Sequence, residues 1–102
     1  MRGGDRVSEQ SSTTTVTGYE PAPSVVHRSV DGSIVLLDLD DGIYYTLEGI
    51  GSDMWSYLCA GLAPVQIVNA LVDEYEVERA TVEGDLAELI ERLVAAGLLR
   101  AR

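Results

Sequence analysis

The stretch Ile34–Trp55, IVLLDLDDGIYYTLEGIGSDMW, decides the fold. It opens with the apolar run Ile34–Leu37, turns at Asp41-Gly42 and runs back through Ile43–Leu47. Asp-Gly between two β-rich runs is the strongest short-range hairpin signal, because a type I′ turn needs positive φ at both central positions. The stretch therefore predicts a β-hairpin that leads into a helix near Trp55.

The second strand of this hairpin is expected at a sheet edge. Tyr44, Tyr45 and Thr46 suit a pleated surface, and nothing after Leu47 reads as another strand. An edge strand carries unpaired backbone groups, so it is either a liability or a docking site. The sequence leaves undecided which side chains of this strand point toward the core. Counting back from Leu47 puts Ile43 and Tyr45 inward, whereas counting forward from the preceding strand puts Tyr44 inward.

The residues before this hairpin add a third strand. Ser24–Val30 is rich in valine, and Asp31-Gly32 repeats the turn signal. Two such turns define a three-stranded antiparallel meander with Ser33–Leu39 as its central strand.

Residues 1–23 are predicted to be a disordered N-terminal arm, and residues 24–102 the folded domain. The arm is polar, with the low-complexity run SSTTT at Ser11–Thr15, and cannot bury enough apolar surface to offset its ordering entropy. The alternative is that the arm docks on the domain through Val16 or Tyr19.

Three helices are predicted in the second half of the chain. The first two span about Ile50–Ala60 and Pro64–Glu74, the second with proline in its favoured first turn. The third runs from Thr81, a candidate N-cap, to Gly97, and Leu98-Leu99 can then fold back onto the core. Its apolar stripe is wider than one packing contact needs and comprises Val82, Leu86, Leu89, Ile90, Leu93 and Val94.

Length and charge narrow the function classes. The chain has 102 residues, which suits one domain, and a formal net charge of −10, which repels phosphate backbones and anionic membranes. No apolar run approaches the roughly 18 residues of a membrane span, and the N-terminus lacks the apolar segment of a secretory signal. The single cysteine, Cys59, cannot form an internal disulfide, so a cytoplasmic location is expected.

No catalytic residue, metal site or cofactor is expected. His27 is the only histidine, and the sequence has no nucleophile motif beside it. Cysteine and histidine clusters with metal-ligand spacing and glycine motifs for nucleotides are missing from the sequence. Trp55 and Cys59 are interpreted as core residues rather than functional ones.

Three strands followed by three helices make an α+β, winged-helix-like arrangement, and its residues resemble a known family. The chain resembles the PqqD-like RiPP recognition elements, most of all the stand-alone form in lasso-peptide pathways, over about Val25–Leu99. The family usually has asparagine where this chain has Glu48, which affects local helix capping. The motifs that carry the resemblance are Leu36–Leu47, Leu47-x3-Gly51-x3-Trp55, Ile67-Val68-x2-Leu71 and Asp85-x3-Leu89-x3-Leu93-x3-Gly97-Leu98-Leu99.

The resemblance implies a non-enzymatic protein that binds the leader segment of a ribosomally made precursor peptide. The leader would add as a strand to the third β-strand, facing the third helix, and be presented to a leader peptidase and a cyclase. Lasso leaders commonly carry a Tyr-x-x-Pro motif, which suits an aromatic and aliphatic groove. The implied binding residues are Ile43, Tyr44, Tyr45, Thr46, Val82, Asp85, Leu86, Leu89, Ile90 and Leu93.

Two other function classes remain alternatives at this point. A winged helix can bind DNA through a helix in a groove, but the two candidate helices, Pro64–Glu74 and Thr81–Gly97, hold six acids against one basic residue, Arg92. A dimerisation module could use the same open strand edge. Neither a nucleic acid nor a membrane is expected as a partner.

Overall fold

The computed structural model describes residues 18–102, and the predicted arm up to residue 17 lies outside this range. Three strands are followed by three helices, as predicted, and two further short strands pair at the ends of this unit. The elements are β1 (Tyr19–Pro21), β2 (Val25–Val30), β3 (Ser33–Asp38), β4 (Tyr44–Glu48), α1 (Ile50–Cys59), α2 (Pro64–Glu74), α3 (Arg79–Ala95) and β5 (Leu99–Ala101).

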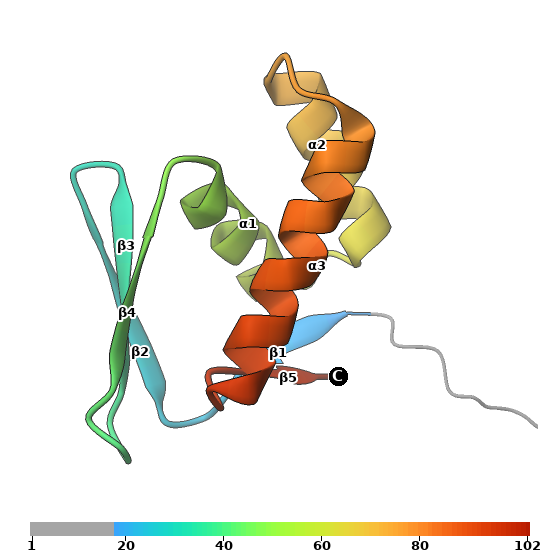
Figure 1. Cartoon of the computed structure of the whole chain (residues 1–102). Coiled ribbons are helices and arrows are strands. Elements are labelled where there is room, and N and C mark those ends of the chain that lie inside the picture. Colours follow the sequence, from blue (N-terminus) through green and yellow to red (C-terminus); the bar gives the residue numbers. More distant parts are fainter. Residues whose placement is uncertain (1–17) are drawn as a thin grey trace, which may run out of the picture.

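The predicted meander is confirmed, with the antiparallel order β2-β3-β4. The first turn adopts the conformation that Asp-Gly predicts, because Asp31 and Gly32 both have positive φ, 48° and 83°. The three-stranded sheet stands to one side of the helices, and α1 follows directly from β4 (Figure 1).

The second turn is wider than the predicted type I′ turn. Among its residues only Gly42 has positive φ, 71°. The N–H of Asp38 donates to the carbonyl of Ile43 at 2.9 Å, so the loop between this bonded pair has four residues, 39–42. The carboxylate of Asp38 holds this loop, since it accepts from the Ser24 hydroxyl and the Asp40 N–H, each at 2.9 Å. These hydrogen bonds, that of Ser24 foremost, lower the pKa of Asp38.

The structure settles which face of β4 points inward. Leu36 pairs with Tyr45, and Ile34 with Leu47, so these side chains share the face that meets the helices. Tyr44 lies on the outer face and is 70% exposed. Counting back from Leu47 therefore gave the right parity for Tyr45. Counting forward from the central strand gave the wrong one, because it took Val35, Leu37 and Leu39 as inward, whereas Ile34 and Leu36 are the buried residues of β3.

The helices follow the predicted order. The bounds of α2 are those predicted, whereas α3 begins at Arg79 after the cap residue Glu78, so Thr81 lies inside the helix and the prediction that it caps α3 is wrong. The Arg79 guanidinium donates to the Asn69 side chain of α2 at 2.7 Å, which joins the earlier start of α3 to its neighbour.

Gly97 ends α3, as predicted. It has φ 78°, and the N–H of Leu98 donates to the carbonyl of Leu93 at 2.9 Å. This is the bond pattern of a Schellman motif, in which glycine takes the left-handed position at no steric cost. Leu98 and Leu99 then turn back into the core, where they are 0% and 2% exposed.

The pairing of β1 with β5 was not predicted. Tyr19 pairs with Ala101 and Pro21 with Leu99, and the Arg100 guanidinium binds Glu20 at 2.7 Å. Residues 19–21 therefore belong to the folded unit, which corrects the assignment of this segment to a disordered arm. The alternative of docking through Tyr19 is confirmed, since its side chain packs against the core.

One hydrophobic core joins the sheet to all three helices. Its centre is Trp55, which is fully buried and donates its indole N–H to Nδ1 of His27 on β2 at 3.2 Å. Tyr57 of α1 donates to Glu74 at the end of α2 at 2.8 Å, and this bond raises the pKa of Tyr57. The core thus fixes the orientation of β4 relative to α1 and α3.

Candidate functional site

The free edge of β4 is the first feature of the candidate site. β4 is an outer strand of the sheet, and no strand within residues 18–102 pairs with its other side. Asp38 and Ile43 form a hydrogen-bonded pair, so by alternation Tyr45 and Leu47 also bond to β3. The N–H and C=O groups of Tyr44, Thr46 and Glu48 therefore point away from the sheet.

A hollow of about 240 Å³ lies beside this edge, between β4, the first turns of α1, and α3, and is called the β4–α3 groove below. Residues from all three elements line it: Tyr45, Thr46, Leu47, Glu48, Ile50, Gly51, Met54, Asp85, Glu88, Leu89 and Arg92.

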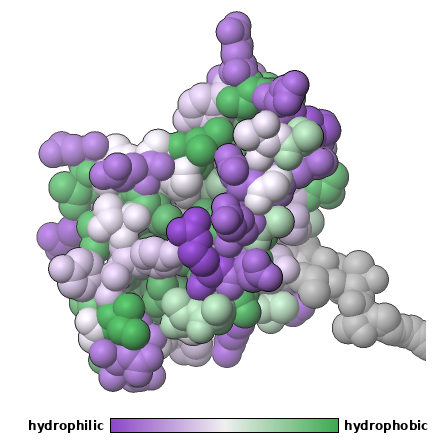
Figure 2. All heavy atoms as spheres, in the orientation of Figure 1, coloured by the Kyte–Doolittle hydropathy of each residue, from purple (hydrophilic) through white to green (hydrophobic). Residues whose placement is uncertain are grey.

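The β4–α3 groove has an apolar floor and a charged rim. Leu47, Met54 and Leu89 are buried at its base, at most 7% exposed. On the rim, Arg92 reaches from α3 to the Tyr45 hydroxyl on β4 at 3.4 Å. Hydrophilic side chains gather in the centre of this face, and hydrophobic and hydrophilic side chains are mixed over the sheet beside them (Figure 2). Such a groove can accept an extended chain whose apolar side chains enter between β4 and α3.

The structure brings four of the ten sequence-predicted binding residues into this groove: Tyr45, Thr46, Asp85 and Leu89. The other six lie elsewhere. Ile43 and Tyr44 are exposed at the tip and outer face of the hairpin, Val82 and Leu93 are buried in the core, and Leu86 and Ile90 line a hollow on the other side of α3.

Seven groove residues were missed, and two simple signals point to them. Ile50, Gly51 and Met54 occupy the first turns of the helix that follows the edge strand directly. On α3, Asp85, Leu89 and Arg92 recur at i, i+4 and i+7, which places them on one helix face. The apolar stripe of α3 does not predict this narrower face, because most of the stripe is core. The missed residues are Leu47, Glu48, Ile50, Gly51, Met54, Glu88 and Arg92.

Other chemistry has little support in the described part of the chain. Within residues 18–102, no group of three or more His, Cys, Asp or Glu side chains is placed to hold a metal ion. Burial raises the pKa of the Cys59 thiol to about 11, so it stays protonated at neutral pH. No described helix is long and apolar enough to cross a membrane.

Comparisons with known proteins identify the family of this chain and similar solved structures. The family model for coenzyme PQQ synthesis protein D (PqqD) matches residues 33–99. The solved structure of TbiB1 in complex with the TbiA(beta) leader peptide is similar, with 40% sequence identity and a TM-score of 0.75, over 78% of this chain and 93% of that one. A lasso peptide synthetase B1 complexed with its leader peptide has 31% identity and a TM-score of 0.74, over 79% and 95%. Comparison with curated proteins gives no significant match.

Proposed function

This chain belongs to the PqqD family, and we propose that it binds the leader segment of a ribosomally synthesised precursor peptide in lasso-peptide biosynthesis. The observation that carries the proposal is the free edge of β4, whose outward backbone groups border the β4–α3 groove. The two solved relatives were both captured with leader peptides, which supports the same class of ligand here.

The leader adds to β4 as a further antiparallel or parallel strand. Main-chain hydrogen bonds to Tyr44, Thr46 and Glu48 supply affinity that does not depend on the leader sequence. Alternate leader side chains enter the groove, where Leu47, Met54 and Leu89 offer an apolar floor. Specificity therefore comes from the shape of this floor and from the charges at its rim.

A bound leader has to reach the enzymes that process it. We propose that this chain performs no chemistry itself and delivers the precursor to a leader peptidase and a cyclase. Leader removal by the cognate peptidase is expected to be faster with this chain than without it, at equal peptidase concentration. An unchanged initial rate, in a mixture where leader binding has been verified, would contradict the delivery role.

Gly51→Leu is expected to lower leader affinity at least tenfold without destabilising the fold. Gly51 lines the β4–α3 groove, and nothing lies within 4 Å of a Cβ built there, so a leucine would fill space that the leader needs. Leucine also has a higher helix propensity than glycine, by roughly 0.5–1 kcal/mol. The measurement is titration with the TbiA(beta) leader and with the leader of a precursor encoded beside this chain's gene.

Gly84→Leu is the matched control for this prediction. Gly84 is also a helical glycine with nothing within 4 Å of its Cβ, but it lies on α3 away from the β4–α3 groove. Its leader affinity should stay within twofold of the parent. Equal losses in both variants would place the leader outside the β4–α3 groove, and a parent that binds neither leader would overturn the proposed function.

A further inference from the structure

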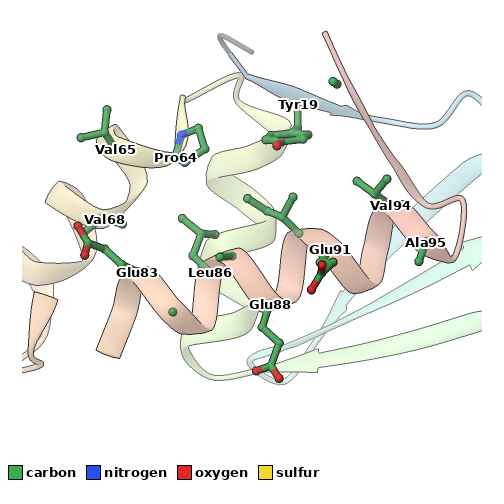
Figure 3. A pocket seen from close by; sticks show the side chains of 14 residues that line it. Tyr19, Pro64, Val65, Val68, Glu83, Leu86, Glu88, Glu91, Val94 and Ala95 are labelled. Atoms are coloured by element: carbon green, nitrogen blue, oxygen red, sulfur yellow. The ribbon is translucent and has the colours of Figure 1, made fainter. Parts of the chain in front are cut away.

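A second and larger hollow lies on the opposite side of α3. This α2–α3 groove has a volume of about 1210 Å³ and is bounded by α2, α3, β1 and β5. Figure 3 shows Tyr19 of β1 and Pro64 and Val65 of α2 on one side of α3, with Leu86 and Val94 pointing toward them. The groove depends on the β1–β5 pairing, since Tyr19 and Ala101 both line it.

The α2–α3 groove exposes apolar side chains that the fold leaves uncovered. Val65 is 63% exposed and Val94 is 44% exposed, and they come from different helices. Val68 and Ile90 form a buried floor beneath them. Single exposed apolar residues are common on protein surfaces, whereas an apolar strip that continues across two helices is typical of an interaction surface.

The charged residues of this groove all have the same sign. Its lining contains Glu83, Glu88 and Glu91 and no lysine or arginine. Glu88 points away from the hollow in Figure 3, which leaves Glu83 and Glu91 on the rim. An apolar strip edged by carboxylates is complementary to a segment with one apolar side and flanking basic side chains.

We propose that the α2–α3 groove docks a basic amphipathic segment of a partner protein. Its apolar side contacts Val65 and Val94, and its lysine or arginine side chains face Glu83 and Glu91. The proposal goes beyond leader binding and does not depend on it, because Glu83, Ala87, Ile90 and Val94 recur at i, i+4, i+7 and i+11 on the helix face opposite Asp85 and Leu89.

The negative charge of the α2–α3 groove disfavours other occupants. A second copy of this chain would bring the same glutamates against one another in a symmetric contact. Phosphate groups of a nucleic acid or a lipid surface would meet the same repulsion. The remaining candidate is the segment that precedes Tyr19, and the experiment below separates it from a partner.

The test uses a 14-residue peptide of leucine and lysine with one apolar side, and a leucine–glutamate peptide of the same pattern. Both are titrated into the ¹⁵N-labelled full chain. The basic peptide is expected to bind saturably, with shifts concentrated at backbone amides of the α2–α3 groove such as Gly84, Ala87 and Ala95. The acidic peptide is expected to cause no such shifts.

Matched variants separate a specific groove from general attraction to an acidic protein. Gly84→Leu should lower the affinity for the basic peptide at least tenfold, and Gly51→Leu should leave this affinity within twofold of the parent. Glu91→Lys and Glu76→Lys change the net charge equally, and Glu76 is an exposed residue outside both grooves. Glu91→Lys should lower the affinity for the basic peptide at least fivefold more than Glu76→Lys does.

Several results would overturn the proposal. Equal losses in Glu91→Lys and Glu76→Lys would mean that net charge alone attracts the peptide. Shifts confined to the β4–α3 groove would assign the peptide to the leader site. A rise of tenfold or more in peptide affinity on deleting residues 1–17 would show that this segment occupies the groove. A concentration-dependent molecular mass that Val94→Asp abolishes would show that a second copy of the chain occupies it.

Discussion

Thr46→Pro is expected to remove most leader binding while the domain stays folded. The N–H of Thr46 points away from β3, so the change costs no bond of the sheet. Edge strands tolerate proline on this side. The lost donor and the displaced side chain should cost roughly 1–3 kcal/mol of binding free energy, about 5- to 150-fold in affinity.

Two neighbouring changes make this prediction specific. Tyr45→Pro removes an N–H that bonds to Leu36 in β3, so here the hairpin itself should weaken and the thermal midpoint should fall. Thr46→Val keeps the N–H and replaces the hydroxyl by a methyl group of similar size, and its leader affinity should stay close to that of the parent. Tyr44→Pro has the same parity as Thr46→Pro and should behave in the same way.

Leader titrations and thermal melts on these variants give the readout. Strand addition to β4 predicts that leader affinity falls when an amide that points away from β3 is removed. It predicts that thermal stability falls when an amide that bonds to β3 is removed. A folded Thr46→Pro variant that binds leader as tightly as Thr46→Val would show that the leader does not pair with this edge.

Trp55→Ala is expected to have the largest effect on stability. Trp55 is fully buried at the junction of sheet and helices, and its indole N–H bonds to His27 at 3.2 Å. Removing such a side chain leaves a cavity and costs about 3–5 kcal/mol. The free energy of unfolding of a native protein is only about 5–15 kcal/mol. Each kcal/mol lost lowers the melting temperature of a domain of this size by about 4–8 °C. The midpoint should fall by at least about 12 °C.

Trp55→Phe separates the packing of this residue from its hydrogen bond. Phenylalanine keeps most of the ring and loses the N–H donor to His27, so the cost should be nearer to that of one hydrogen bond, about 1 kcal/mol. His27→Ala removes the acceptor and should cost a similar amount. Thermal or denaturant melts measure all three, and a Trp55→Ala variant that melts within a few degrees of the parent would show that Trp55 does not anchor the core.

Loss of Trp55 should also reach the binding groove. Its neighbour Met54 lies on the floor of the β4–α3 groove, and both residues sit on α1 directly after β4. A loosened α1 would leave the groove poorly formed, so leader affinity should fall in Trp55→Ala even at temperatures where the variant is folded.

The sequence by itself determined the meander, the order of the helices and where α2 and α3 end. These features are encoded in short windows: Asp31-Gly32 permits a tight turn, Pro64 starts a helix, and Gly97 stops one. The family resemblance rested on other short motifs, such as Leu36–Leu47 and Leu47-x3-Gly51-x3-Trp55, and the match over residues 33–99 confirms it. The open edge of β4 was also predictable, because no strand-like run of ordinary length follows Leu47.

Only the tertiary structure decided which side chains meet. The pairing of Glu20 with Arg100, 80 positions apart, depends on backbone hydrogen bonds between three-residue strands, which leave almost no side-chain pattern. The inward parity of β4 depended on which face of β3 meets the helices, and this is the face of Ile34 and Leu36, which pair with Leu47 and Tyr45. The apolar stripe of α3 divided into a core row and two opposite grooves only once its neighbours were placed, because hydrophobic spacing shows which face is buried and not what covers it.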